Sequence, residues 1–277
     1  MAEPLFRKIT IVGVGLLGGS IGKAARKHGL GREICGFSRH PKKIVLAKRL
    51  GLIDTGTDCF AEAVENSDLI VLCSPVEDIK MRLRQLKQLG ITRTLVTDVG
   101  STKREIIRAA RGLNFVGSHP LAGSEQSGMK YANHRLLEQS LCIVIEDGAQ
   151  KKSIATVRRF WNDMGSRVVV MKARVHDQAL GFTSHLPHAV AFALMAAVPP
   201  HLEHLAAGGL KDSTRIAMSS PELWKDIFLS NRGNILKGLS VFERSLKRLK
   251  DAIAARNTAS LLKILKTSRQ KRGRLPS

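Results

Sequence analysis

The chain is poor in aromatic residues, in acidic residues and in cysteine. Aromatic residues make up 4% of its 277 residues, so the core must be built from aliphatic side chains, alanine and glycine. Such a core favours close-packed helices around a buried parallel sheet. No apolar run is long enough to span a bilayer, and little chain precedes the first predicted strand, which leaves no room for a signal peptide. We therefore expect a cytoplasmic protein with no membrane partner.

The cysteines are scattered and show neither CxxC nor metal-like spacing. They are Cys35, Cys59, Cys73 and Cys142. We predict that they are reduced residues of the core. His185 and His188, with Asp177 on the same helix face, come nearest to a metal site, but neither Cys nor Glu completes the ligand set. We predict no metal.

Basic residues outnumber acidic ones by 45 to 23, which gives a formal net charge of +22. This charge is compatible with nucleic-acid binding, with a basic cleft for an anionic substrate and cofactor, or with a solvated basic face. Residues 261–277 hold basic residues and no acidic one, which is typical of a frayed tail. Since no aromatic residue interleaves with these charges to stack on bases, we expect no nucleic-acid ligand.

The stretch from residue 8 to residue 22 reads KITIVGVGLLGGSIG, a β-branched run that enters a GxGxxG loop and is followed by a helical pattern. Gly13 suits a tight turn, Gly15 lets a pyrophosphate approach the backbone, and Gly18 lets the helix pack on the strand. The free N–H groups at the helix start would face the phosphates. The predicted cofactor contacts here are Gly13, Gly15, Leu16, Leu17 and Gly18.

The second predicted strand, 33–37, is not followed by the Asp or Glu that holds the ribose 2′-hydroxyl in NAD-binding units. Ser38 and Arg39 stand there instead, with Lys42 and Lys43 close behind. A carboxylate would repel a 2′-phosphate, whereas a hydroxyl and a guanidinium would bind it. The sequence therefore favours NADP as the cofactor, with NAD as the alternative.

Strands and helices alternate through the first half, which predicts an α/β Rossmann domain with a doubly wound, mostly parallel sheet. Residues 54–56 are predicted to be a turn. Further strands are expected within 67–76 and at 94–99, 114–117 and 141–145. Loops at the carboxyl ends of parallel strands face the cofactor. The predicted contacts in these loops are Cys73, Ser74, Pro75, Asp98 and Gly100.

After a last strand at 167–171 the pattern is helical, which predicts a dinucleotide-binding domain at 1–171 and an all-α substrate and dimerisation domain at 172–277. One helix is expected from Arg174 to Val198, with a kink at Pro187. The site would lie in the cleft between the two domains.

The remaining helices of this second domain are set by local signals. The pair Gly208-Gly209 is predicted to break one helix. Ser220-Pro221 has the N-cap and first-turn signature of another. Two more helices are expected at 232–256 and 258–270.

Polar side chains that could carry chemistry occur in both predicted domains. His119 follows a strand and could accept a proton near neutral pH, although a structural role is the alternative; Ser101 could orient it or bind a substrate hydroxyl. Arg215 follows the glycine pair and suits a carboxylate. One helix face is predicted to be either a polar seam or an anion-binding wall. Its residues are Asp177, Gly181, Ser184, His185 and His188.

Six motifs occur in a fixed order along the chain. They are Gly13–Ser20, Thr97–Lys103, Gly117–Glu125, Ser184–His188, Lys211–Ala217 and Trp224–Ile227. Together they resemble the prephenate/arogenate dehydrogenases of tyrosine biosynthesis. The resemblance covers nearly the whole chain except the basic tail, and the stretches around His119 and His185 are far more specific than the glycine loop.

The resemblance implies a Rossmann domain followed by a helical dimerisation domain, and hence a homodimer acting on a small molecule. It also implies oxidative decarboxylation of prephenate to 4-hydroxyphenylpyruvate or of arogenate to tyrosine, with hydride passing to NAD(P). His119 matches the histidine that removes the 4-hydroxyl proton, Ser101 the serine that orients it, and Arg215 the arginine that holds a carboxylate. Further substrate contacts implied by the resemblance are Ser124, Glu125, Ser184, His185, His188 and Trp224.

Two other functions fit part of the pattern. A β-hydroxyacid or imine dehydrogenase with the same two-domain plan would not need Ser184–His188 beside the His119 loop. A nucleotide-sensing protein that binds nucleic acid would use the net positive charge and would bind DNA or RNA in a salt-sensitive way.

Overall fold

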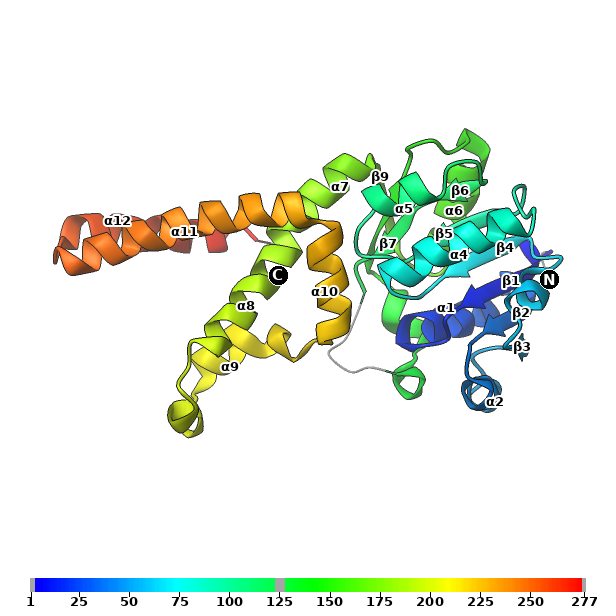
Figure 1. Cartoon of the computed structure of the whole chain (residues 1–277), viewed down its shortest axis with the longest axis horizontal. Helices are drawn as coiled ribbons and strands as arrows, with labels where there is room; N and C mark the ends of the chain where they lie inside the picture. Colours follow the sequence, from blue (N-terminus) through cyan, green and yellow to red (C-terminus); the bar gives the residue numbers. More distant parts are fainter. Residues whose placement is uncertain (1–2, 123–127, 276–277) are drawn as a thin grey trace.

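The computed structural model describes residues 3–122 and 128–275. The described residues of the first half form a six-stranded sheet whose pairings are all parallel, in the order β3-β2-β1-β4-β5-β6 (Figure 1). The strands are β1 (Phe6–Val12), β2 (Gly31–Phe37), β3 (Thr55–Thr57), β4 (Leu69–Leu72), β5 (Leu95–Asp98) and β6 (Phe115–Val116). The order reverses between β1 and β4, as in doubly wound nucleotide-binding folds. The predicted Rossmann fold is confirmed.

Helices cover both faces of this sheet because its central strands are apolar on both sides. In β4, Leu69 and Val71 pack into one core cluster and Ile70 and Leu72 into the other, and all four are fully buried. The first cluster includes residues of α1, α2 and α6, and the second includes residues of α3, α4 and α5. These helices are α1 (Leu16–Lys27), α2 (Pro41–Arg49), α3 (Phe60–Val64), α4 (Val76–Gln88), α5 (Arg104–Ala109) and α6 (Lys151–Asp163).

A second, three-stranded sheet corrects the prediction that residues 141–145 extend the main sheet. It consists of β7 (Ser118–Pro120), β8 (Leu141–Ile145) and β9 (Arg167–Met171), with β7 antiparallel to β8 and β8 parallel to β9. The chain leaves the main sheet at Gly117, where an added Cβ would lie 3.3 Å from side chains of Ile107 and Ile145. The predicted turn at 54–56 is also wrong, since residues 55–57 form the short edge strand β3.

The prediction that all four cysteines are core residues is wrong for one of them. Cys35 in β2 and Cys142 in β8 are buried, and Cys73 is partly buried just after β4. Cys59 is exposed, because it is the N-cap residue of α3 in the loop after edge strand β3.

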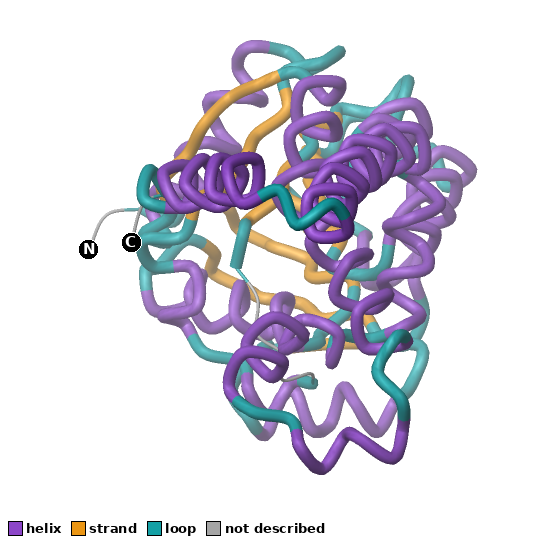
Figure 2. Tube along the Cα trace, turned by 90° about the vertical axis from the view of Figure 1, so that its left-hand side faces the viewer, coloured by secondary structure: helices purple, strands orange, loops and turns teal. Residues whose placement is uncertain are grey.

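The second half is helical and extends away from the sheets as a long arm (Figure 1); viewed along that arm, the helices lie in front of the strands (Figure 2). Its helices are α7 (Ala173–Leu180), α8 (Leu186–Ala196), α9 (Gly208–Thr214), α10 (Pro221–Ser230), α11 (Arg232–Ala254) and α12 (Thr258–Arg272). Short 3₁₀ helices in the chain lie at Met129–Tyr131, His134–Leu137, Pro200–Leu205 and Arg215–Met218.

The long helix predicted from Arg174 to Val198 is continuous from Ala173 to Ala196, but it contains a π-helical turn at Gly181–His185. The irregularity precedes Pro187, which stands in the first turn of α8, where proline is tolerated. Ser220 caps α10 as predicted and accepts from the Leu223 N–H.

Two helical predictions need correction. The pair Gly208-Gly209 begins α9 rather than breaking a helix. The basic tail is not frayed over most of its length, because α12 continues to Arg272.

The helix Ala173–Ala196 is long and apolar enough to cross a membrane by length and composition, which the sequence prediction did not anticipate. Only 22% of its apolar window is buried within the chain. The same helix carries His176, Asp177 and His185, which are buried against polar partners.

Candidate active site

A cavity of about 680 Å³ lies where the two halves meet, and it brings together the described residues predicted to act on the substrate. The first half contributes Ser101, from the loop after β5, and His119, from β7. The helical half contributes Ser184, His185, His188, Arg215 and Trp224. Ser124 and Glu125, also predicted as substrate contacts, lie outside the described residues.

His119 is held by a partner that the sequence prediction missed. Its Nδ1 lies 2.8 Å from Nε2 of His176 on α7, and Nδ1 of His176 lies 2.9 Å from Oδ1 of Asp177. His119 is therefore oriented by a His-Asp pair from the helical half. No hydrogen bond joins Ser101 to His119 in the part of the chain that the structure describes.

The Asp177 carboxylate fixes the direction of this chain of hydrogen bonds. It accepts the backbone N–H of Lys103 at 2.8 Å and that of Arg104 at 3.0 Å. Burial alone would raise the pKa of Asp177, but the hydrogen bonds from His176 and these two amides outweigh it and lower the pKa. Since a carboxylate only accepts, His176 donates from Nδ1 and accepts at Nε2. His119 must then donate from Nδ1, which leaves its Nε2 lone pair free to act as a base.

A buried ion pair lies beneath His119. Lys103 and Asp98 are both fully buried, and the Lys103 ammonium donates to the Asp98 carboxylate and to the Ser118 carbonyl. Asp98 also accepts from the backbone N–H groups of Gly100 and Ser118, at 2.8 and 3.1 Å. These bonds tie the loop after β5 to the strand that carries His119. Asp98, predicted as a cofactor contact, lines neither the site cavity nor the cavity beside the glycine loop.

Burial lowers the pKa of His119 well below 6.5, and the charges of His176, Lys103 and His185 lower it further. An uncharged imidazole is the form that can accept a proton. His119 is therefore uncharged at neutral pH, which is the form that the predicted role as a base requires.

The helical wall of the cavity is aromatic and imidazole-rich. The His188 ring stacks on Trp224 with centroids 3.6 Å apart, and its Nδ1 lies 2.9 Å from the Ser184 carbonyl oxygen. His185 meets the edge of Trp224 at a centroid distance of 5.9 Å. The π-helical turn shifts the register between α7 and α8, and Ser184 and His185 lie within it.

The glycine loop fits a dinucleotide. Gly13 has φ +98°, and a Cβ added there would lie 2.9 Å from the Cys73 carbonyl oxygen, so only glycine suits this turn. A Cβ added to Gly18 would collide with the Gly13 carbonyl oxygen. Nothing lies within 4 Å of a Cβ at Gly15, the N-cap residue of α1. Open space over a helix N-terminus is what a pyrophosphate requires.

A cavity of about 260 Å³ continues from this loop to the end of β2. The predicted contacts that line it are Gly13, Gly15, Ser38, Arg39, Cys73, Ser74 and Pro75. The Ser74 hydroxyl is buried without a hydrogen-bond partner among the described residues, so a ligand could use it. Leu16, Leu17 and Gly18 begin α1, and they do not line this cavity; neither does Gly100.

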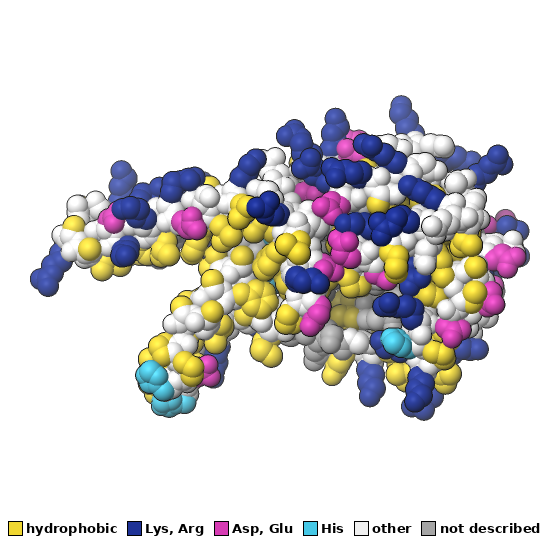
Figure 3. Space-filling model, viewed as in Figure 1, with side chains coloured by type: hydrophobic (Ala, Val, Ile, Leu, Met, Phe, Trp, Pro, Cys, Tyr) yellow, Lys and Arg dark blue, Asp and Glu magenta, His cyan; other side chains and the backbone are white. Residues whose placement is uncertain are grey.

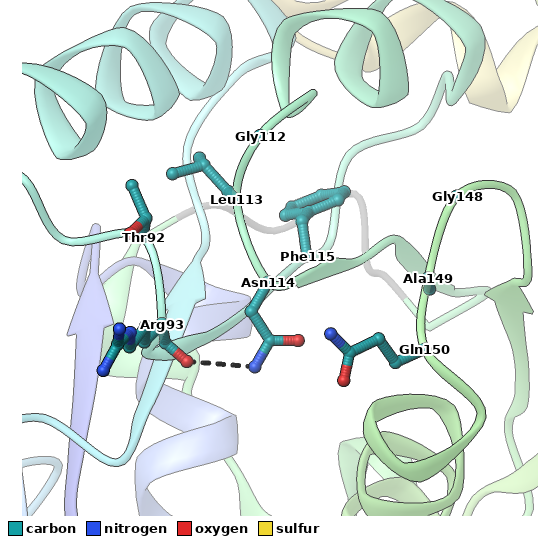
Figure 4. Close-up of a pocket in the computed structure, with 9 residues that line it drawn as sticks. All are labelled: Thr92, Arg93, Gly112, Leu113, Asn114, Phe115, Gly148, Ala149 and Gln150. Carbon is teal, nitrogen blue, oxygen red and sulfur yellow. Dashed lines mark hydrogen bonds between the residues drawn. The ribbon is translucent and has the colours of Figure 1, made fainter.

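A third cavity, of about 420 Å³, lies at the amino-terminal ends of β5 and β6 (Figure 4). Asn114 there donates to the Arg93 carbonyl oxygen and accepts from the Ser153 hydroxyl. No histidine and no buried unpaired polar atom of the described chain lies in it. It therefore offers less chemistry than the cavity beside His119.

Three buried residues of the site were missed by the sequence prediction: His176, Lys103 and Asn231. His176 precedes Asp177, which was placed on the polar helix face, so the His-Asp pair was a usable signal. Lys103 ends the motif Thr97–Lys103, but no role was predicted for it. Asn231 gave no signal, since its role depends on contacts with residues distant in sequence.

The main sheet has the topology of nucleotide-binding folds, and the His119 imidazole and the Arg215 guanidinium line one cavity. These features fit a dehydrogenase that uses a nicotinamide cofactor. The family model described as prephenate dehydrogenase, nucleotide-binding domain, matches residues 21–170, and the one described as prephenate dehydrogenase, dimerization domain, matches residues 172–267. The chain belongs to the prephenate dehydrogenase family.

Individual relatives agree with this assignment. The chain is 32% identical to the prephenate dehydrogenase of Bacillus subtilis over 97% of its own length and 76% of that protein. It is similar to the structure of prephenate dehydrogenase from A. aeolicus in complex with hydroxyphenyl propionate and NAD+, with a TM-score of 0.87, 38% identity and coverage of 96% and 97%. It is also similar to Synechocystis arogenate dehydrogenase, with a TM-score of 0.81, 26% identity and coverage of 96% and 99%.

Proposed function

We propose that this chain catalyses the oxidative decarboxylation of prephenate, of arogenate, or of both, with a nicotinamide dinucleotide as hydride acceptor. The observation that supports this most is that His119 and Arg215 line the same cavity. The reaction needs a base beside the 4-hydroxyl and a cation beside a carboxylate. Family membership supports the same reaction.

In this proposal His119 accepts the 4-hydroxyl proton on Nε2. A dinucleotide held by the glycine loop and the neighbouring cavity would accept the hydride from the ring carbon that bears the hydroxyl. The ring carboxylate would leave as carbon dioxide as the ring becomes aromatic. The Nδ1–H of His119 stays bonded to His176, so Asp177 stabilises the positive charge that develops on the pair of rings. Arg215 holds a carboxylate, and the ring stack of His188 and Trp224 walls the cavity.

We propose NADP in preference to NAD, with NAD as the alternative. The cavity at the end of β2 is lined by the cationic side chains of Arg39, Lys43 and Arg82 and by one carboxylate, that of Asp78. Oδ2 of Asp78 lies 3.7 Å from Nε of Arg82. The Arg39 guanidinium has no carboxylate within 4.0 Å among the described residues. An excess of positive charge in this position suits a 2′-phosphate. The A. aeolicus structure holds NAD+, so the preference needs a direct measurement.

We propose that the first domain ends at residue 171 and the second begins at residue 172. We also propose that the protein is a homodimer. The chain exposes 16171 Å², whereas a compact monomer of 30.3 kDa exposes about 11,800 Å². Hydrophobic side chains gather along the lower side of the α11–α12 arm and along α8 (Figure 3). Those exposed in these helices include Leu194, Leu236, Val241, Leu246, Ile253, Leu262 and Leu265. A second copy of the chain would cover this surface.

We propose that the enzyme works in the cytoplasm.

The test is an assay of the purified chain with prephenate or arogenate and with NAD or NADP, in all four combinations. We expect absorbance at 340 nm to grow with at least one substrate, and faster with NADP. Absence of turnover in all four, together with tight salt-sensitive binding of DNA or RNA, would favour the nucleic-acid alternative instead. Light scattering of the same sample reports the oligomeric state.

A further inference from the structure

Asn231, at the junction of α10 and α11, is buried against the π-helical turn of the long helix. Its Nδ2 lies 2.7 Å from the Asp177 carbonyl oxygen and 3.0 Å from Nδ1 of His185, and its Oδ1 accepts from Asn234 at 2.8 Å. Gly181 makes the approach possible, since a Cβ there would lie 2.9 Å from Cβ of Asn234. All hydrogen-bonding atoms of the Asn231 amide are therefore used inside the protein.

The orientation of this amide determines the tautomer of His185. A backbone carbonyl oxygen only accepts hydrogen bonds, so the group that faces Asp177 must be the NH₂ of Asn231. The second N–H of the same NH₂ points to Nδ1 of His185. That ring nitrogen must accept, and the ring proton is then on Nε2.

The Nε2 atom of His185 has no hydrogen-bond partner among the described residues, although His185 is 1% exposed and lines the cavity that holds His119 and Arg215. A buried N–H without a partner is costly in free energy. A bound molecule with an oxygen acceptor at this point would remove that cost.

We propose that Asn231 is a positioning residue that holds His185 as an uncharged Nε2–H donor to an oxygen atom of the substrate. This inference depends on the proposed function, since it places the oxygen on prephenate or arogenate. It assigns Asn231 no contact with the substrate.

The charged and titratable groups around His185 keep the ring neutral. Burial lowers the pKa of His185 to about 4; Asp177 opposes the shift, and His176 and His188 add to it. His119 lines the same cavity, and the charge of His185 is one of the causes that lower the pKa of His119. His185 is therefore a neutral donor at neutral pH.

The direct test is ¹⁵N NMR of histidine-labelled whole protein without substrate, with the His185 signals assigned by their loss in His185→Gln. We expect Nε2 to be protonated and Nδ1 unprotonated, with no change between pH 8 and pH 6. A protonated Nδ1, or an average of both tautomers, would overturn the proposal. This measurement does not need a variant of Asn231 to fold.

The second test is Asn231→Asp, which replaces the NH₂ donor by an acceptor. The carboxylate would accept a hydrogen bond from Nδ1 of His185, so the proton of the neutral ring would move from Nε2 to Nδ1. The negative charge would also raise the pKa of that ring, so that KM becomes pH-dependent. We expect KM to rise by about tenfold at pH 8 relative to the unaltered enzyme, to recover toward pH 6 as the ring becomes a cation, and kcat to change less. A folded Asn231→Asp enzyme with an unaltered KM at both pH values would contradict the proposal.

Asn257→Asp is the matched control. Asn257 is the exposed N-cap residue of α12 and accepts from the Ser260 N–H at 2.9 Å, a bond that aspartate retains. It makes the same chemical change far from the site, and we expect it to leave KM and its pH dependence unaltered. If neither prephenate nor arogenate is turned over, the proposed function fails, whereas the NMR result still tests the role of Asn231.

Discussion

The two halves of the molecule bury their apolar side chains in different ways. In the nucleotide-binding half, central strand β4 is buried on both faces. In the helical half, α12 has no buried residue, and large apolar side chains of α11 such as Leu236 and Leu246 are about half exposed. The first half encloses apolar core clusters, whereas many apolar side chains of the second half are exposed in the single chain. This difference supports the proposal that a second copy of the chain covers the helical half.

The same two halves divide the chemistry. The nucleotide-binding half supplies His119, and the helical half supplies His176 and Asp177, which orient it, as well as Arg215. The proposed base and the residues that orient it therefore come together only when the halves pack as they do here.

The largest effect is expected from His119→Asn, which removes the base from the first half. We expect kcat to fall by about 10³-fold, because general base catalysis contributes in that range, with KM little changed. His28→Asn, at the exposed end of α1, is the control. A fall in kcat of less than about tenfold would show that another group takes the proton.

The next effect tests the contribution of the helical half. We expect His176→Leu to lower kcat by about 10²-fold, because His119 loses its acceptor and with it the fixed tautomer, while KM stays the same. His176→Gln should recover part of the loss, since its amide can accept from His119 and donate to Asp177. Equal kcat values for the Leu and Gln variants would argue against the hydrogen-bond role.

Arg215→Gln should act on binding instead. We expect KM to rise by about 30-fold through loss of a charge-assisted hydrogen bond to a carboxylate, with kcat within about threefold of the unaltered value. Steady-state kinetics with saturating cofactor separate the two parameters. A change confined to kcat would mean that the guanidinium acts on the transition state rather than on substrate binding.

Acidification should destabilise the site where the halves meet. Burial lowers the pKa of His185 to about 4 and lowers the pKa of His119 below 6.5. The unfolded chain therefore binds more protons than the folded one below pH 6.5, so the stability present above that pH is lost as the pH falls. From His185 alone the free energy of unfolding falls by about 2 kcal/mol by pH 5. Calorimetry should therefore show a Tm about 5 °C lower at pH 5 than above pH 6.5. The Tm of His185→Gln should fall less on acidification than that of the unaltered enzyme. An equal fall would contradict the assignment of this effect to His185.

The smallest effect concerns the cofactor and lies within the first half. We expect Arg39→Ala to raise KM for NADP by about tenfold through loss of a phosphate contact and to leave KM for NAD unchanged. Equal losses for the two cofactors would remove the argument for a 2′-phosphate site.

Local sequence pattern was enough to predict the Rossmann fold of the first half, although not the second sheet or strand β3. The apolar strands, the glycine loop and the cap at Ser220 carry their signals within a few residues, and these were confirmed. Residues of the motif around His119 and of the motif Ser184–His188 line the same cavity, and their roles in catalysis stay predictions.

The sequence could not predict which residues far apart in the chain come into contact. Strand β7 has three residues and pairs with β8, whose facing residues lie more than 20 positions further along the chain. The bond from His176 to His119 spans 57 residues, and that from Asn231 to Asp177 spans 54. No periodicity or local motif reports such contacts.

The most direct test of the account is a double-mutant cycle on kcat with His119→Asn, His176→Leu and the two combined. If His176 acts through His119, the double variant should be no slower than His119→Asn alone, because the support has nothing left to orient. Losses that multiply in the double variant would contradict the central claim that the helical half positions the base of the nucleotide-binding half.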